Sequence, residues 1–266
     1  MIARVASPTV SVITINRNTG NSVGRTIHSV LAQTYPFQWV VVDGASSDDS
    51  LGALRSAIRP GDTFISEPDT GIAEAFNKGL GLATAEAVVF MNAGDEFADP
   101  NALRQLIVNW DYEAFDWAFG AAEVVDESGA SLFVRRIKKA IKPQGLVQSG
   151  CRVFHQAAIV KRQVFEEFGG FNQAYRLAMD YELWVRLIKA GKAPQILDHV
   201  VCRFRLGGMS SDPILRWNED SRARKQNGMA NSWLKDLCLR FIVSVKSLMR
   251  SRVGPWAFRL KEVLRW

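Results

Sequence analysis

Apolar runs of strand length alternate with helix-like segments through the first 110 residues, and this alternation constrains the fold more than any other feature. The strand-like runs are rich in Val, Ile and Phe, and they cover residues 9–15, 38–43, 62–66 and 87–92. Apolar residues recur at helical spacing between them, over residues 21–33, 72–84 and 100–110. This alternation is typical of a doubly wound α/β fold with a mostly parallel sheet, which binds ligands at the carboxyl ends of its strands.

The pattern changes in the second half of the chain. Residues 116–126 and 132–136 flank a turn that contains Gly, so we expect antiparallel strands added to the sheet. A strand is expected over 153–160, and it carries His155 and Gln156. Helices are expected over 162–168 and from about 180 to 190, with a closing strand over 195–206. A chain of 266 residues, 47% of them hydrophobic, is long enough to form one large domain with a substantial core.

The C-terminal part carries most of the positive charge. Residues 203–266 contain 14 Lys or Arg and 5 Asp or Glu, whereas residues 1–202 contain 19 and 22. Apolar residues recur at helical spacing over 233–249 with cations beside them, which predicts an amphipathic helix. We therefore divide the chain into a main domain, residues 1–229, and a basic helical tail, residues 230–266.

Two interpretations of the tail stay open. Its apolar stripe could pack on the protein's own core or on a second subunit of a homo-oligomer, or it could lie in the plane of an anionic membrane surface. Nucleic acid is not an expected partner, because a stripe this apolar does not suit phosphates. The three cysteines are scattered, and the sequence shows no basic-then-apolar leader and no apolar stretch of the roughly 18 to 20 residues that span a bilayer. We therefore expect a cytoplasmic protein. With its basic tail, we expect it to be peripheral on the inner face of the plasma membrane.

Three aspartates stand at the ends of predicted elements, where a ligand site would form. Asp43 ends a strand-like run, Asp95 follows another in "MNAGDEF", and Asp180 begins a helix. Each has a structural explanation as well, because turns and helix N-termini favour Asp. The functional interpretation is that Asp43 binds a nucleobase, Asp95 binds a divalent cation on a diphosphate, and Asp180 is a general base.

Several segments, in the same order, resemble family 2 glycosyltransferases. They are "SVITINRNTG", "VVVDGASSDDS", "EPDTGIAEAFNKGL", "VVFMNAGDEF", "FHQAAIVKRQVFEEFGGFN" and "MDYELWVRL", within residues 8–210. The likeness is to bacterial enzymes that assemble exopolysaccharide or lipopolysaccharide, including the colanic-acid type. It implies a GT-A fold with a Rossmann-like sheet, a nucleotide-diphosphate sugar donor, a divalent Mn²⁺ or Mg²⁺ and inversion at the anomeric carbon.

The resemblance also implies site residues by position. The nucleotide-sugar-binding positions that it implies are Thr14, Asn16, Asp43, Asp69, Gly71, Asn77, Lys78 and Asn92. Asp95 matches the last acid of a D-x-D-type metal segment, in which Asn92 and Gly94 here replace acids. Asp180 matches the catalytic base, with Met179 in place of the Glu that often precedes it. The positions implied on the acceptor side or in a loop over the diphosphate are His155, Gln156, Arg186, Gly208 and Ser210.

The implied reaction is a direct displacement. Asp180 takes a proton from a glycan hydroxyl, expected on a lipid-linked acceptor, as that oxygen attacks the anomeric carbon. Two alternatives stay open. A sugar nucleotidyltransferase would use a glycine-rich loop with Arg and Lys near the N-terminus, which this sequence lacks. A catalytically silent nucleotide-sugar or lipid-binding protein remains compatible with Asn92, Gly94 and Met179.

Overall fold

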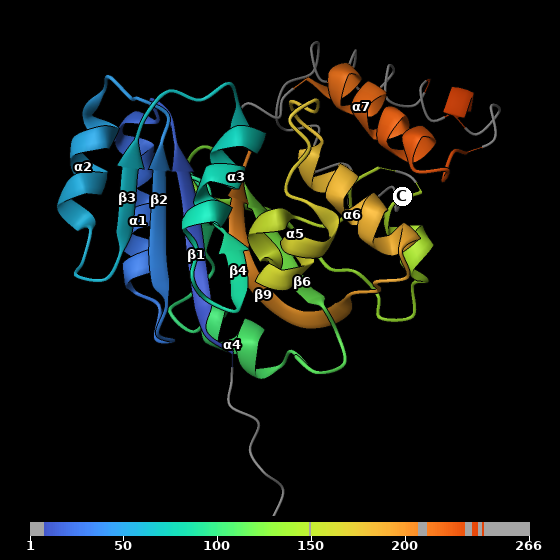
Figure 1. Ribbon diagram of the computed structural model, residues 1–266, viewed down its shortest axis with the longest axis horizontal. Coiled ribbons are helices and arrows are strands. Elements are labelled where there is room, and N and C mark those ends of the chain that lie inside the picture. Colours follow the sequence, from blue (N-terminus) through green and yellow to red (C-terminus); the bar gives the residue numbers. More distant parts are fainter. Residues whose placement is uncertain (1–7, 149, 207–211, 232–235, 239–240, 242–266) are drawn as a thin grey trace, which may run out of the picture.

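The computed structural model describes residues 8–148, 150–206, 212–231, 236–238 and 241 (Figure 1). The strands are β1 (Val10–Asn16), β2 (Gln38–Asp43), β3 (Thr63–Ser66), β4 (Ala87–Phe90), β5 (Glu96–Phe97), β6 (Trp117–Val125), β7 (Ser131–Arg135), β8 (Ala158–Lys161) and β9 (Gln195–Arg205). The α-helices are α1 (Val23–Leu31), α2 (Asp49–Ala57), α3 (Ile72–Leu82), α4 (Ala102–Val108), α5 (Arg162–Phe168), α6 (Met179–Lys189) and α7 (Pro213–Gln226).

The strands form one sheet in the order β3-β2-β1-β4-β8-β6-β9-β5, with β7 paired to β6 outside this path. Strands β1 to β4 run parallel to one another, and β6 is parallel to β9. Strand β8 is antiparallel to both of its neighbours, and β5 and β7 are antiparallel to theirs. The prediction of a mostly parallel α/β sheet with antiparallel strands in the second half is therefore confirmed.

Two hydrophobic cores lie on opposite faces of the sheet, because successive residues of a strand point to opposite sides. In β1, Ile13 and Ile15 join the core beneath α3, α5 and α6, whereas Val10 and Val12 join the core beneath α1, α2 and α4. Figure 1 shows α3 and α5 in front of the sheet and α1 behind it. Full burial of one such side chain contributes about 1.5 to 3 kcal/mol, so the near-continuous apolar runs favour a sheet that is covered on both faces.

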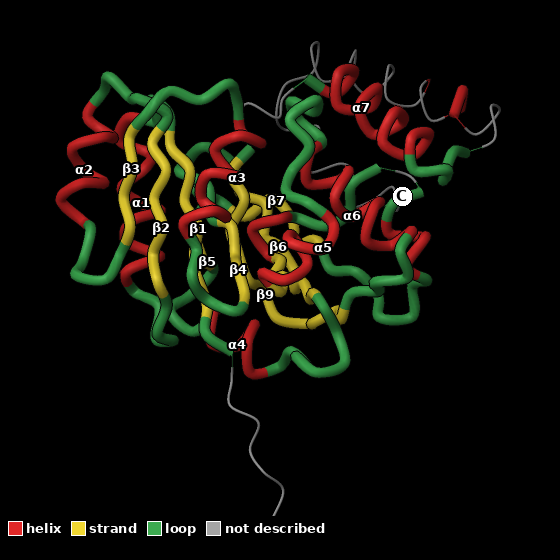
Figure 2. Tube along the Cα trace, viewed as in Figure 1, coloured by secondary structure: helices red, strands yellow, loops and turns green. Residues whose placement is uncertain are grey.

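The second half differs from the prediction in two places. Residues 153–160 were expected to form a strand that carries His155 and Gln156, but His155–Ala157 form a short 3-10 helix, η3, before β8. The helix α7 was not predicted, because its sequence is too polar for an apolar periodicity; it begins where Asp212 accepts from the backbone N–H groups of Ile214 and Leu215. Figure 2 shows α7 beside α6 and away from the sheet.

Other predictions concern the C-terminal region. Most of the predicted helix over 233–249 lies outside the described residues. Gly208 and Ser210 also lie outside them. Within the described ranges, no helix is both long enough and apolar enough to cross a bilayer.

The contact between α3 and β1 gives a test of this packing. A Cβ at Gly79 would lie 2.4 Å from Cγ2 of the fully buried Ile13, whereas a Cβ at Gly81, on the same helix, would meet no atom within 4 Å. We expect Gly79→Ala to lower the free energy of unfolding by about 1 to 3 kcal/mol through overpacking. Gly81→Ala should raise it by up to about 1 kcal/mol, because alanine favours the helix. Urea denaturation of both variants measures the difference, and equal effects would contradict this packing.

Candidate active site

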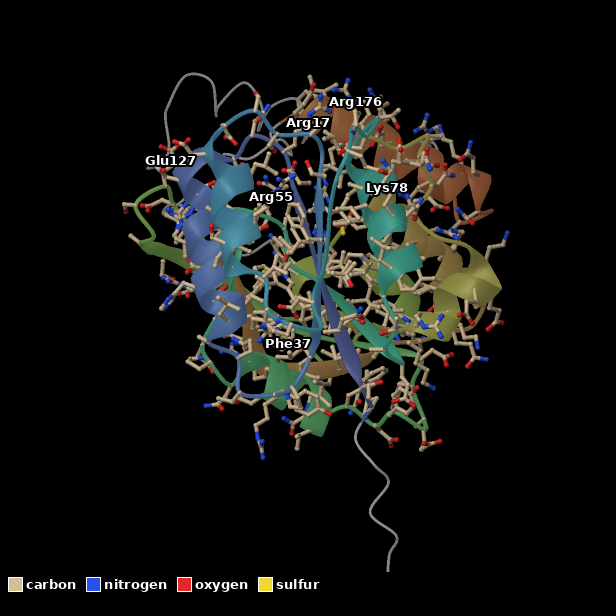
Figure 3. The ribbon with its side chains drawn as sticks, turned by 60° about the vertical axis from the view of Figure 1, so that its left-hand side comes forward. Arg17, Phe37, Arg55, Lys78, Glu127 and Arg176 are labelled. Atoms are coloured by element: carbon tan, nitrogen blue, oxygen red, sulfur yellow. The ribbon has the colours of Figure 1, made fainter. Side chains whose placement is uncertain are left out.

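The carboxyl ends of the parallel strands form one polar edge of the sheet. Asn16 at the end of β1 is in register with Asp43 at the end of β2, which is in register with Ser66 at the end of β3. Figure 3 shows Arg17 and Arg176 at this end of the molecule, with Phe37, just before β2, at the opposite end. The parallel pairing therefore collects these polar residues at one edge of the sheet.

Asp43 organises this edge from a fully buried position. Its Oδ1 accepts from Nδ2 of Asn16 at 2.7 Å and from the Ser46 hydroxyl at 2.6 Å. Its Oδ2 accepts from the Ser46 backbone N–H at 2.9 Å and the Ser66 hydroxyl at 2.7 Å. Burial opposes ionisation, but these four hydrogen bonds hold the pKa of Asp43 below its ordinary value. The carboxylate is thus bonded to its own chain, and its contact with a nucleobase stays a prediction.

Thr14 and Asn16 also bond within the chain. The Thr14 hydroxyl is buried in the sheet and accepts from Nε1 of Trp39 at 2.9 Å. The amide nitrogen of Asn16 also lies within 3.1 Å of the hydroxyls of Ser46 and Ser50, in addition to Asp43. The two residues therefore shape the first strand end, and their contacts with a nucleoside stay predictions.

Lys78 fixes the loop that precedes α3. Its Nζ lies 2.8 Å from a carboxylate oxygen of Glu67 and 3.1 Å from one of Glu74, and it donates to the carbonyl of Pro68 at 2.7 Å. Gly71 precedes the helix with φ of +150°, a backbone conformation that favours glycine. Lys78 therefore holds the loop before α3, which is expected to lie beside the nucleotide sugar, in one conformation.

Asp69 places its carboxylate beside the end of β2. Its side chain is 6% exposed, and a Cβ at Gly44 would lie 2.3 Å from its Oδ2. Nη1 of Arg17 lies 3.7 Å from Oδ1 of Asp69, while the Arg17 side chain is 61% exposed. A cation held at the strand edge by a carboxylate is available to the phosphate oxygens of a ligand.

Two other predicted site residues anchor the segment between α5 and α6. The Asn77 amide makes two hydrogen bonds of 2.8 Å with the backbone N–H and carbonyl of Phe171, and Arg186 donates to the carbonyl of Gly170 at 2.8 Å. Gly170 is needed there, because a Cβ would lie 2.3 Å from Oδ1 of Asn77. These side chains hold the backbone in place, and ligand contacts by Asn77 or Arg186 stay predictions.

Asp95 is held in a tight turn after β4. Its N–H donates to the carbonyl of Asn92 at 3.0 Å, and Gly94 has φ of +102°, which suits glycine. The Thr26 hydroxyl on α1 accepts from the Gly94 N–H at 2.9 Å and donates to the Asp95 carbonyl at 2.6 Å. The turn is therefore fixed to a helix on one face of the sheet.

The short helix η3 joins Asp95 to Asp180. Nε2 of Gln156 donates to Oδ2 of Asp95 at 2.6 Å, and Nδ1 of the adjacent His155 lies 3.3 Å from Oδ2 of Asp180. Burial raises the pKa of Asp95 to about 6 despite the bond from Gln156. Nε2 of His155 is buried and has no hydrogen-bond partner in the described part of the chain. Two residues in sequence thus bring together two carboxylates from different elements.

Asp180 lies in the first turn of α6 and is 5% exposed. It accepts from the Tyr181 N–H at 2.7 Å, and Nη2 of Arg216 on α7 lies 3.8 Å from its Oδ1. Burial raises the pKa of Asp180, but His155, Arg216 and the Tyr181 N–H lower it by more. The pKa of Asp180 is therefore below its ordinary value. The carboxylate is therefore ionised at neutral pH.

A glutamate on α7 accepts hydrogen bonds from backbone N–H groups just before α6. Glu219 is 6% exposed and accepts from the backbone N–H groups of Arg176, Leu177 and Ala178 at 2.8–2.9 Å. The N-cap residue of α6, Ala178, has no side chain that could cap the helix, so a carboxylate from another helix satisfies these donors. Sequence reasoning missed Arg216 and Glu219; the available signal was the Asp-Pro pair at 212–213, a common helix start.

The residues around Asp95 fit a metal that binds together with a diphosphate. Asp95 offers a carboxylate, and Oδ1 of Asn92 is buried without a hydrogen-bond partner among the described residues. The described ranges contain no group of three or more His, Cys, Asp or Glu that could hold an ion. Mn²⁺ and Mg²⁺ prefer oxygen ligands and keep waters and phosphate oxygens, so few protein ligands suffice.

An α/β sheet in this order, with an acid at the end of β2 and another after β4, is the GT-A architecture of glycosyltransferases. The model of the family described as "Glycosyl transferase family 2" matches residues 11–169, more than half of the chain. The chain therefore belongs to glycosyl transferase family 2.

Curated relatives agree with this assignment. An uncharacterized glycosyltransferase of Mycobacterium tuberculosis (strain ATCC 25618 / H37Rv) is 30% identical over 220 residues, which cover 77% of this chain and 78% of that protein. A PGL/p-HBAD biosynthesis glycosyltransferase of Mycobacterium bovis (strain BCG / Pasteur 1173P2) is 26% identical over 221 residues, which cover 78% and 81%.

Solved structures share the fold. A mannosyltransferase from Pyrobaculum calidifontis, in complex with GDP-Man and Mn²⁺, matches with a TM-score of 0.65 and 19% identity, over 98% of this chain and 80% of that one. Residues 1–349 of S. aureus TarS, in complex with UDP-GlcNAc, match with a TM-score of 0.65 and 15% identity, over 95% and 74%. At these identities the likeness shows the fold alone.

The contact of Glu219 with the start of α6 gives a second test. We expect Glu219→Ala to lower the free energy of unfolding by about 1 to 3 kcal/mol, because buried N–H groups lose their acceptor. Glu113→Ala, at an exposed glutamate, is the control. Thermal and urea denaturation measure both variants. A Glu219 variant as stable as the Glu113 variant would show that this carboxylate does not hold α6.

Proposed function

We propose that this glycosyltransferase is inverting and moves a sugar from a nucleotide-diphosphate donor to a hydroxyl of a glycan acceptor. The observation that carries the proposal is the pair of buried carboxylates, Asp95 and Asp180, joined by Gln156 and His155. Asp95 follows a central strand, where α/β sheets bind ligands, and Asp180 begins a helix that faces it through η3. Nucleotide sugars bound to the solved structures of the same fold, GDP-Man and UDP-GlcNAc, support a donor of this class.

Asp180 is the general base in this proposal. Its pKa lies below the ordinary value, so it is ionised at neutral pH and can accept a proton from an acceptor hydroxyl. His155 and Arg216 hold two sides of the carboxylate and keep it in one orientation. One base and a single displacement give inversion at the anomeric carbon.

Asp95 and Asn92 would hold the divalent metal at the diphosphate. When bound, a Mn²⁺ or Mg²⁺ ion supplies positive charge that neutralises the departing diphosphate. Gln156 keeps the Asp95 carboxylate in place, and the exposed Arg17 adds a second positive charge at the same strand edge. The Mn²⁺ in the mannosyltransferase complex supports this part of the proposal.

The acceptor and the cellular location are the finer parts of the proposal. A lipid-linked glycan acceptor in bacterial surface polysaccharide synthesis is consistent with the relative named for PGL/p-HBAD biosynthesis. Such an acceptor would place the enzyme on the cytoplasmic face of a membrane, with the basic tail, residues 230–266, against anionic lipid. Flotation of the full chain with anionic vesicles, compared with a chain truncated after Gly228, tests the role of the tail.

Asp180→Asn tests the base. The amide keeps the shape of the side chain but cannot accept a proton at neutral pH, so we expect transfer to fall by roughly 100-fold to 10,000-fold. Binding of UDP or GDP with Mn²⁺, measured by calorimetry, should stay close to that of the wild type. Asp49→Asn, at an exposed aspartate in the first turn of α2, is the matched control and should keep full activity. Turnover near wild type by the Asp180 variant would assign the base elsewhere.

Asp95→Ala tests the metal. We expect Mn²⁺ to increase the affinity of the wild type for UDP or GDP, and this increase should disappear in the variant because the carboxylate ligand is lost. Asp99→Ala, at an exposed aspartate four residues later, should keep the full response to Mn²⁺. An undiminished response in Asp95→Ala would remove Asp95 from the metal site. Binding without any transfer in the wild type would favour the catalytically silent alternative.

A further inference from the structure

One stretch of the chain is purely cationic. Residues 128–165 contain no Asp or Glu, and their eight Lys and Arg residues are Arg135, Arg136, Lys138, Lys139, Lys142, Arg152, Lys161 and Arg162. The body of the chain, residues 1–202, is slightly acidic as a whole, so this run is a local reversal of charge. Six of these cations fall within residues 135–152, between β7 and η3.

The structure turns this stretch into a surface. Ile137 and Ile141 are half-buried and pack against the core beneath α6. Lys138 and Lys142, each next to one of these isoleucines, are exposed. Because the two apolar side chains anchor the segment, the lysines are directed to solvent.

Two adjoining hollows lie along the segment. The first is lined by Arg136, Ile137, Lys138, Ala140, Ile141 and Arg152, and therefore combines positive charge with apolar side chains. The second shares Ile141 and combines the polar Lys139 and Gln195 with the apolar side chains of Phe115, Pro143, Leu146, Pro194 and Ile196. Cations beside apolar side chains in both hollows match a molecule with a phosphate at one end and hydrocarbon at the other.

Most of the cations at residues 135–152 have no acidic partner among the residues that the structure describes. Lys139 forms an ion pair with Asp198 at 2.7 Å, and Arg136 donates to the backbone carbonyl of Asp198. Lys138, Lys142 and Arg152 form no ion pair and no side-chain hydrogen bond within the described ranges. Two of these cations, Lys138 and Arg152, line the first hollow, which is therefore complementary to an anion.

The cationic surface reaches the candidate active site. The Arg135 guanidinium lies 5.8 Å from the ring centre of Phe154, the residue before His155. Burial lowers the pKa of Arg135, and the positive charges of Arg152 and Arg216 lower it as well. Arg216 in turn contacts Asp180. Positive charge thus runs from the hollow to the carboxylate.

We propose that the segment Arg135–Lys142, together with Arg152, binds the phosphate-bearing headgroup of an anionic lipid. The phosphate lies against Arg136, Lys138 and Arg152, and the apolar side chains of the adjoining hollow contact the first part of the hydrocarbon. The same lipid would serve as the acceptor; that step rests on the proposed function, whereas the binding itself is tested without turnover.

Vesicle flotation of the full chain tests the proposal. The vesicles contain phosphatidylcholine alone or mixed with phosphatidylglycerol. The test variant is Lys138→Gln/Lys142→Gln/Arg152→Gln. The control variant is Arg25→Gln/Arg55→Gln/Arg104→Gln, which removes the same charge from exposed positions on α1, α2 and α4. The tail is intact in both variants, so its contribution to binding is the same.

We expect the test variant to lose about 100-fold in affinity for the mixed vesicles, about fivefold for each cation near an anionic surface, whereas the control loses much less. A double variant, Lys138→Gln/Lys142→Gln, changes exposed residues alone and should lose about 25-fold by the same reasoning even if Arg152→Gln affects folding. The test, double and control variants should all bind UDP or GDP as tightly as the wild type does. A wild-type protein that binds the mixed vesicles but neither UDP nor GDP would contradict the proposed function and would still support the lipid site.

Three results would overturn the lipid site. Equal flotation of the test and control variants would show that binding does not use this segment. A wild type that prefers neither kind of vesicle would show that no anionic lipid is bound. Inorganic phosphate alone, followed by tryptophan fluorescence and bound as tightly as the mixed vesicles, would make this a phosphate site without a lipid.

Discussion

The parallel pairing of β1 with β2 and β4 is the constraint on which the rest of the molecule depends. Because parallel strands end at the same edge, Asn16, Asp43 and the turn that carries Asp95 are collected there before any side chain interacts. The four hydrogen bonds to Asp43 then fix the loops at that edge. This part of the site is thus a consequence of backbone topology, with the side chains making it rigid.

The second half of the site depends on charged groups in the interior. Asp180, Arg216, Glu219 and Asp220 lie between or near α6 and α7, and burial raises the pKa of Asp220 to about 7. Buried charges cost free energy unless they are paired and hydrogen-bonded, so such a cluster is a poor means of adding stability. Its effect is orientation: Arg216 contacts the Asp180 carboxylate, while Glu219 holds the backbone before α6.

The family model covers the first half of the site but not all of the second half. The family model ends at residue 169, so it includes Asp43, Asp95 and the η3 pair but stops short of Asp180. The base of the proposed reaction therefore lies beyond the residues that the family model matches, in the same part of the chain as α7. An acceptor site in this half would allow one donor-binding architecture to serve different acceptors.

The sequence by itself determined the α/β alternation, the strand ends at Asn16 and Asp43, and the helix that begins near Asp180, because periodicity and strand propensity act over a few neighbouring residues. Only the tertiary structure decided how these pieces are used. His155 was expected on a strand and lies on η3, while Asn77 and Lys78 bond to the protein's own backbone. Contacts such as Gln156 with Asp95 and Arg216 with Asp180 join residues 61 and 36 positions apart. No local pattern encodes such pairs, because they exist only once sheet and helices have packed.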